Sequence, residues 1–206
     1  MQITESMNLA LPFGDGMIAY HVPIDRAVYE LHYAVINATK AALSRKGIHY
    51  QMGSGPRIAN LVLKDEGLKD AAERQNVDAK GNVFDDRTPT LLEEIKRLTM
   101  ILAPGASGYE NLPVDVAIAQ GKIDAEDWSE MEAQICFFMC HAMPTKKANR
   151  ASIAAATASV LNGLIAPSPI TAYIASLQTS TKVASTANPA SLPTPSDTPV
   201  ATGFPI

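Results

Sequence analysis

The sequence predicts a mainly α-helical fold that begins with a short β-hairpin and ends in a disordered tail rich in Pro, Ser and Thr. Apolar residues recur at three- and four-residue intervals over most of the chain, two short apolar runs flank a glycine-containing turn near the start, and five of the 14 prolines gather near the end. We therefore expect one helical domain at residues 1–177, with its hairpin at residues 7–22, and a flexible tail at residues 178–206.

The hairpin is predicted from residues 7–12 and 17–22, two apolar runs separated by Phe13-Gly14-Asp15-Gly16. Glycine adopts positive φ at little steric cost, so Gly14 and Gly16 suit a tight connection between two strands. The tail is predicted from its composition, because a segment of Pro, Ser, Thr and Ala with few charges buries too little apolar area to offset its ordering entropy.

Capping residues, prolines and glycines divide the remaining chain into helices. The strongest boundary is Asp124, which can cap a helix while Asp127 completes a capping box, and Ile123 and Trp128 stand at the positions of a hydrophobic staple. Thr88 is expected to cap another helix. The expected helical ranges are 25–46, 55–68, 88–102, 114–120, 124–143, 146–162 and 168–177, and residues 73–87 are expected to form a solvated loop.

Composition and charge exclude several classes of protein. The chain has 206 residues, 47% of them hydrophobic and 18% charged, which is typical of a folded protein. A net charge of −4 offers no field for phosphates, so we expect no nucleic-acid partner. The first twenty residues lack a basic region, and no apolar run matches a membrane-spanning helix, so neither export nor a membrane partner is expected. Two cysteines fit a reducing compartment.

Motifs for catalysis or metal binding are weak. Cys136 and Cys140 lie four residues apart, but His141 projects about 100° away from Cys140 on a helix and no second cysteine pair exists, so buried small side chains are the better interpretation. Gly53-Ser54-Gly55 lacks the Lys-Ser/Thr of a P-loop, and Gly105-Ala106-Ser107-Gly108 lacks the glycine spacing of a nucleophile elbow. We expect no catalytic, cofactor-binding or metal-binding residues, no cofactor, and no enzymatic activity.

The order of elements resembles the tail assembly chaperones of tailed bacteriophages, over roughly residues 9–143. The segments that carry the resemblance are the hairpin leading into His21-Val22-Pro23-Ile24, Gly55-Pro56-Arg57-Ile58-Ala59, Glu94-Ile95-Lys96-Arg97-Leu98-Thr99, and the run from Pro104-Gly105-Ala106-Ser107-Gly108-Tyr109 through Leu112-Pro113, Ile123-Asp124, Asp127 and Phe137-Phe138.

This resemblance implies a helical, non-enzymatic protein of the host cytoplasm. Such a chaperone binds the tape-measure protein, keeps it soluble while the tail tube assembles around it, and is absent from the mature virion. The expected partners are the tape-measure protein and the tail-tube protein, with a homo-oligomer as an open alternative. The alternative function is a structural subunit or adaptor of the virion tail, which presence in the mature particle would reveal.

A chaperone needs apolar surface that is not used by its own core. The candidates are the Met and Phe residues near the end of the helix at 124–143 and apolar residues of the alanine-rich segment after it, because Met-rich surfaces repack around varied partners. Closure of the protein's own helical core is the competing interpretation of both sets. The expected partner-binding residues are Phe137, Phe138, Met139, Met143, Ile153, Val160 and Leu161.

Overall fold

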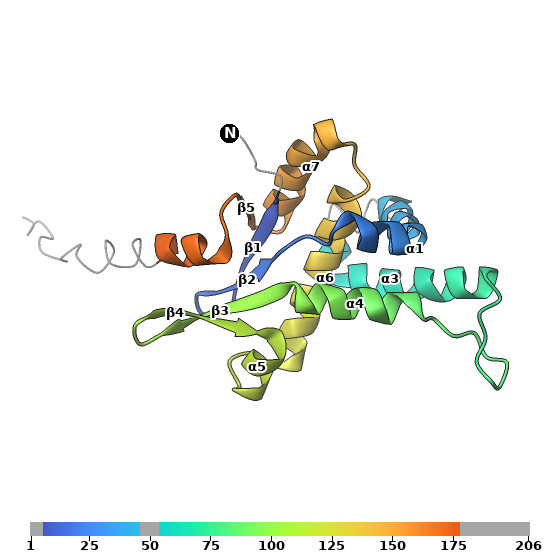
Figure 1. Cartoon of the computed structure of the whole chain (residues 1–206), viewed down its shortest axis with the longest axis horizontal. Helices are drawn as coiled ribbons and strands as arrows, with labels where there is room; N and C mark the ends of the chain where they lie inside the picture. The colour runs from blue at the N-terminus through green and yellow to red at the C-terminus, as the bar shows by residue number, and fades with distance from the viewer. Residues whose placement is uncertain (1–5, 46–53, 178–206) are drawn as a thin grey trace, which may run out of the picture.

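The computed structural model describes residues 6–45 and 54–177 (Figure 1). These residues form an α+β fold in which helices pack on a five-stranded antiparallel sheet of order β4-β3-β2-β1-β5. The prediction of a mainly α fold is wrong, because the expected hairpin is one part of this larger sheet. The expected tail at residues 178–206 lies outside the described residues.

The predicted hairpin forms the centre of the sheet. Strands β1 (Asn8–Phe13) and β2 (Met17–His21) pair in register from Leu9 opposite His21 to Phe13 opposite Met17. Gly14 and Gly16 have φ values of 49° and 78°, the left-handed backbone that their lack of a Cβ allows. The sequence thus located both the strands and their turn.

A second hairpin begins within the expected end of the helix at 88–102, because residues 99–102 belong to a strand. Strands β3 (Thr99–Gly105) and β4 (Gly108–Pro113) form this hairpin, and β3 pairs with β2. The run of residues 98–102 fits either a helix or a strand, because short apolar runs carry no decisive periodicity. Pairing with strand β2 decides the outcome: Thr99 lies opposite His21, which is 78 residues earlier in the chain. The short edge strand β5 (Leu164–Ala166) completes the sheet beside β1.

The predicted capping box at Asp124 begins helix α6 (Ala125–Ala142). The Asp124 carboxylate accepts hydrogen bonds of 2.8 Å from the backbone N–H groups of Glu126 and Asp127, and the Asp127 carboxylate accepts one of 3.0 Å from the Asp124 N–H, which confirms the capping box. The helices are α1 (Arg26–Arg45), α3 (Ser54–Glu73), α4 (Arg87–Arg97), α5 (Val114–Ala119), α6 (Ala125–Ala142) and α7 (Lys147–Val160), and residues 170–177 are also helical.

The start of α4 differs from the prediction. Thr88 does not cap the helix; instead the carboxylate of Asp85 accepts hydrogen bonds from the backbone N–H groups of Arg87 and Thr88, at 3.1 and 3.0 Å. Thr88 is buried inside the first turn. An aspartate in this position also complements the positive end of the helix dipole.

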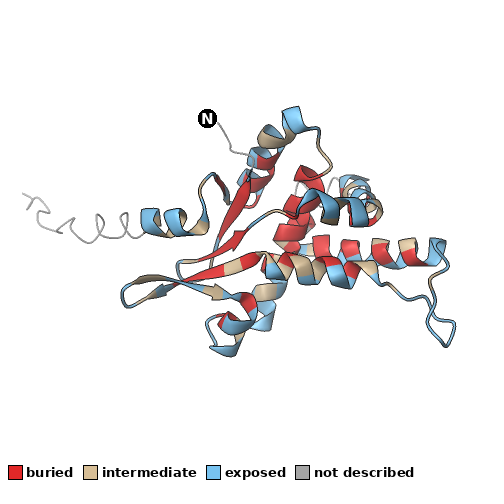
Figure 2. Cartoon of the chain, in the orientation of Figure 1, coloured by how far each residue is buried: buried red, intermediate tan, exposed pale blue. Residues whose placement is uncertain are grey.

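Apolar residues pack on both faces of the sheet. One face carries Leu9, Leu11, Ala19 and Ile101, which join the helices in the main core, and α6 contacts α1, α3, α4 and α7 within it (Figure 2). Alternate residues of the same strands point to the opposite face, where residues 170–177 pack against them. The sheet is therefore apolar on both sides, with a large layer on one and a small layer on the other.

Helices α3 and α4 approach each other closely at Gly67. A Cβ at this position would lie 1.9 Å from Thr88 Oγ1 and 2.4 Å from Asp85 Oδ2, so the pair of elements requires a glycine here. The Thr88 hydroxyl is buried with no hydrogen-bond partner in the described part of the chain.

We expect Gly67→Ala to lower the free energy of unfolding by about 1–3 kcal/mol, because overpacking at Thr88 outweighs the helix propensity of alanine, worth roughly 1 kcal/mol. Urea denaturation followed by circular dichroism measures the change. Adding Thr88→Ala should restore part of the loss, whereas Thr88→Ser, which keeps the Oγ, should not. A Gly67→Ala protein more stable than the wild type would contradict the close approach.

Candidate interaction surfaces

Five of the seven expected partner-binding residues lie in the core. Phe137, Phe138 and Met139 are at most 1% exposed, and Met143 and Leu161 are also buried. These five side chains cannot touch a client while the fold is closed, so the structure supports the competing interpretation that they close the protein's own core. The other two, Ile153 and Val160, are 39% and 45% exposed on α7.

The cysteine pair of α6 is also in the core. Cys136 and Cys140 are fully buried, and desolvation raises the pKa of Cys140 to about 12 and that of Cys136 well above its ordinary value. Both thiols therefore stay protonated and unreactive at neutral pH. The adjacent His141 forms a 2.8 Å hydrogen bond through Nδ1 with the Phe137 carbonyl, and burial lowers its pKa. Among residues 6–45 and 54–177, no group of three or more His, Cys, Asp or Glu side chains could hold a metal ion.

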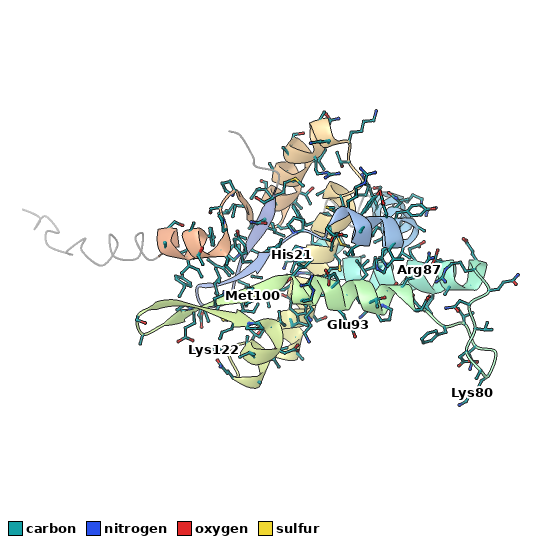
Figure 3. All side chains as sticks on the ribbon, in the orientation of Figure 1. His21, Lys80, Arg87, Glu93, Met100 and Lys122 are labelled. Atoms are coloured by element: carbon teal, nitrogen blue, oxygen red, sulfur yellow. The ribbon has the colours of Figure 1, made fainter. Side chains whose placement is uncertain are left out.

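His21 is a buried, neutral histidine at the end of β2, near the middle of the molecule (Figure 3). The Thr99 hydroxyl donates to the Ile95 carbonyl at 2.7 Å, so it accepts the 2.9 Å hydrogen bond from His21 Nδ1–H. The other ring nitrogen is buried without a hydrogen-bond partner in the described residues. Desolvation lowers the pKa of His21 to about 3. This arrangement ties α4, β2 and β3 together.

The exposed apolar surface of α3 was not predicted. Leu61 and Leu68 are 60% and 49% exposed, and both point away from the face that packs on the core. They stand seven residues apart, so they lie one above the other on the outer side of the helix. Lys64 and Asp65 are exposed between them.

The residues that follow α3 form an ordered arm where the sequence predicted a solvated loop. The arm comprises residues 75–86, and its tip at Lys80 projects away from the rest of the molecule (Figure 3). Val77 pairs with Val83 in an antiparallel bridge, and the Asn76 side chain donates a 2.7 Å hydrogen bond to the Phe84 carbonyl. Val77, Val83 and Phe84 are all exposed, at 53%, 44% and 54%.

Polar contacts hold the arm in shape. At its turn, the Asp78 carboxylate accepts hydrogen bonds from the Asn82 and Lys80 backbone N–H groups, which lower its pKa. At its base, the Arg74 guanidinium bridges Asp70 on α3 and Asp86, with N–O distances of 2.8 and 2.7 Å. The hydrogen bond from Arg74 lowers the pKa of Asp86. The exposed Phe84 is therefore presented on an ordered support. In the sequence, Val77, Val83 and Phe84 stand inside an otherwise polar and charged stretch, and this pattern could have indicated the arm.

The buried neutral His21 predicts a pH dependence of stability. In the unfolded chain a histidine has a pKa near 6.5, whereas in the folded protein the pKa of His21 is about 3. Between these two pH values the unfolded state binds a proton at this position and the folded state does not. The contribution of His21 to the free energy of unfolding is therefore fully present above pH 6.5. It decreases as the pH falls towards 3, by up to about 1.4 kcal/mol per pH unit.

We expect His21→Asn, whose amide can still donate to Thr99, to show a shallower fall in melting temperature between pH 7 and pH 4.5 than the wild type. Thermal unfolding across that range measures both slopes. Carboxylates titrate equally in the two proteins, so the difference isolates position 21. Equal slopes would show that His21 is not kept neutral by the fold.

Comparisons with known proteins leave the function to be inferred from the chain itself. No family model, curated protein or solved structure matches the sequence or the fold. Among the described residues, no helix combines the length and the apolar character that crossing a membrane requires. The exposed apolar residues of α3 and the arm are therefore the features from which a function is proposed.

Proposed function

We propose that this protein is a tail assembly chaperone of a tailed bacteriophage, which binds the tape-measure protein without catalysis. It keeps that protein soluble in the host cytoplasm during assembly of the tail tube and is not retained in the mature virion. Two things support the proposal: the resemblance of residues 9–143 to that family, and the apolar surface of α3 and the arm.

The surface of α3 and the arm is the observation that carries the proposal. It holds five of the twelve large hydrophobic side chains that are exposed in the described residues, although α3 and the arm span only residues 54–86. Concentrated exposed apolar side chains mark interaction sites, whereas scattered ones do not. The five are Leu61, Leu68, Val77, Val83 and Phe84.

The spacing of these residues suits a helical client. Side chains repeated every seven residues on one helix insert between the side chains of a second helix that runs alongside. Leu61 and Leu68 form such a row, and the exposed Lys64 beside it can pair with an acidic residue at the edge of a contact. An ordered aromatic residue such as Phe84 adds contact area at a small entropic cost.

The experiment compares the tagged protein with variants in phage-producing cells, using affinity purification and mass spectrometry. We expect the wild type to recover the tape-measure protein and the double variant Leu61→Glu/Leu68→Glu to recover about tenfold less, since losing central interface contacts costs at least that much in affinity. The matched control is Leu31→Glu/Val116→Glu, which alters two exposed apolar residues on α1 and α5.

Purified mature particles are analysed in parallel. Recovery of the tape-measure protein from lysates, with the chain missing from particles, supports the chaperone. A stoichiometric amount in particles would make the protein a structural subunit of the tail instead. Equal recovery by the α3 variant and its control would remove α3 from the binding surface.

A further inference from the structure

The second face of the sheet is an apolar surface made by four adjacent strands. Its residues alternate with those of the main core along β5, β1, β2 and β3, and each is at most 8% exposed. Such a surface stays out of water only while another element covers it. The residues are Ala10, Ile18, Tyr20, Leu102 and Ala166.

Residues 170–177 cover this face together with Tyr109 of β4. Ile170, Tyr173, Ile174 and Leu177 pack on it, and the Tyr173 ring lies 5.3 Å from the ring of Tyr20 at an angle of 42°. The four positions are spaced i, i+3, i+4 and i+7, the pattern by which an amphipathic helix enters an apolar groove. The structure therefore shows that an amphipathic helix fits this face.

The covering segment is joined to the sheet through a short proline-containing link. Pro167 and Pro169 flank Ser168, whose carbonyl accepts hydrogen bonds from the Tyr20 hydroxyl and from Asn8 Nδ2, the latter at 3.3 Å. Asn8 Nδ2 also donates to the Tyr20 hydroxyl at 2.8 Å. These bonds fix the point where the segment leaves β5, and the apolar side chains hold the helical part beyond it.

We propose that the second sheet face is a docking groove for an amphipathic helix, and that residues 170–177 are a resident ligand that a helix of the client displaces. An amphipathic helix in a protein is stabilised mainly by packing of its apolar face, so residues 170–177 lose that support when they leave the groove. A helix already formed within a long client avoids the cost of ordering and competes with the tethered segment. Identification of the client as the tape-measure protein rests on the proposed function. The assignment of the sheet face as a docking groove does not depend on that function.

The test uses the full chain and a fluorescein-labelled peptide of residues 168–177, cross-linked between positions 172 and 176 to hold it helical. Both positions face away from the groove. Fluorescence anisotropy measures peptide binding to the wild type and to Ile174→Asp, which ejects the resident segment. We expect binding to Ile174→Asp to be at least about tenfold tighter, because a tethered ligand competes at roughly millimolar effective concentration.

Two controls make the result specific. Ala172→Asp places the same charge on the exposed side of the segment and should bind the peptide no better than the wild type. A peptide that itself carries Ile174→Asp should bind none of the proteins. Equal binding of the unaltered peptide to wild type and Ile174→Asp would place it outside the groove and overturn the proposal.

Hydrogen exchange on the wild type decides the matter if Ile174→Asp does not fold. We expect the amides of residues 171–177 to exchange at least about a hundredfold faster than those of residues 135–142 in α6, because detachment of the segment leaves the main core intact. Protection equal to that of α6 would mean that the segment opens only with global unfolding, and would overturn the proposal. Neither measurement uses the tape-measure protein, so its outcome is separate from that of the proposed function.

Discussion

A stretch of helix that is buried on every side must satisfy its own polar groups, and the second half of α6 is such a stretch. Every residue from Ile135 to Met143 is buried, so no face of this stretch reaches water. Its sequence, ICFFMCHAM, contains one polar side chain, His141, and that ring bonds to the carbonyl of Phe137 one turn earlier. Helices α1, α3, α4 and α7 pack against α6, and apolar residues of one sheet face join the same core.

The two ends of α6 meet different environments, and the sequence reflects both. The exposed first turn carries the capping box of Asp124 and Asp127, where carboxylates satisfy free N–H groups and complement the dipole. At the buried end, Pro144 follows the C-cap residue Met143 and prevents the helix from continuing. Local chemistry of this kind is readable from a sequence because it depends on residues within one or two turns.

The same reasoning explains which parts of the fold were predicted. The β1–β2 hairpin and the stop at Gly121 depend on backbone conformations that only glycine adopts easily; Gly121 has a φ of 65°. Strand β3 depends on β2, a partner far away in the chain, so its apolar run was assigned to a helix. No local pattern distinguishes those outcomes, and the mainly α prediction failed for that reason.

Five of the seven expected partner-binding residues lie in the core for a related reason. The Met and Phe residues near the end of α6 were expected to be available to a partner, whereas an uncharged run of nine residues fits a helix enclosed all round. The face of α3 with Leu61 and Leu68 shows the opposite case, because both leucines are exposed and the sequence indicated no partner-binding role for them. Periodicity identifies apolar positions, but the number of neighbouring elements decides whether they meet protein or water.

A chaperone for a long apolar client faces a conflict between affinity and its own solubility. A permanently exposed apolar area large enough for tight binding also promotes self-association, so the exposed part must remain small. The surface of α3 and the arm meets that limit by placing a few large side chains among charged ones. The second sheet face meets it differently, because residues 170–177 keep its apolar residues covered. Under the proposed function, the exposed surface makes the first contact with the client and the covered groove adds affinity only after a client helix has displaced the resident segment.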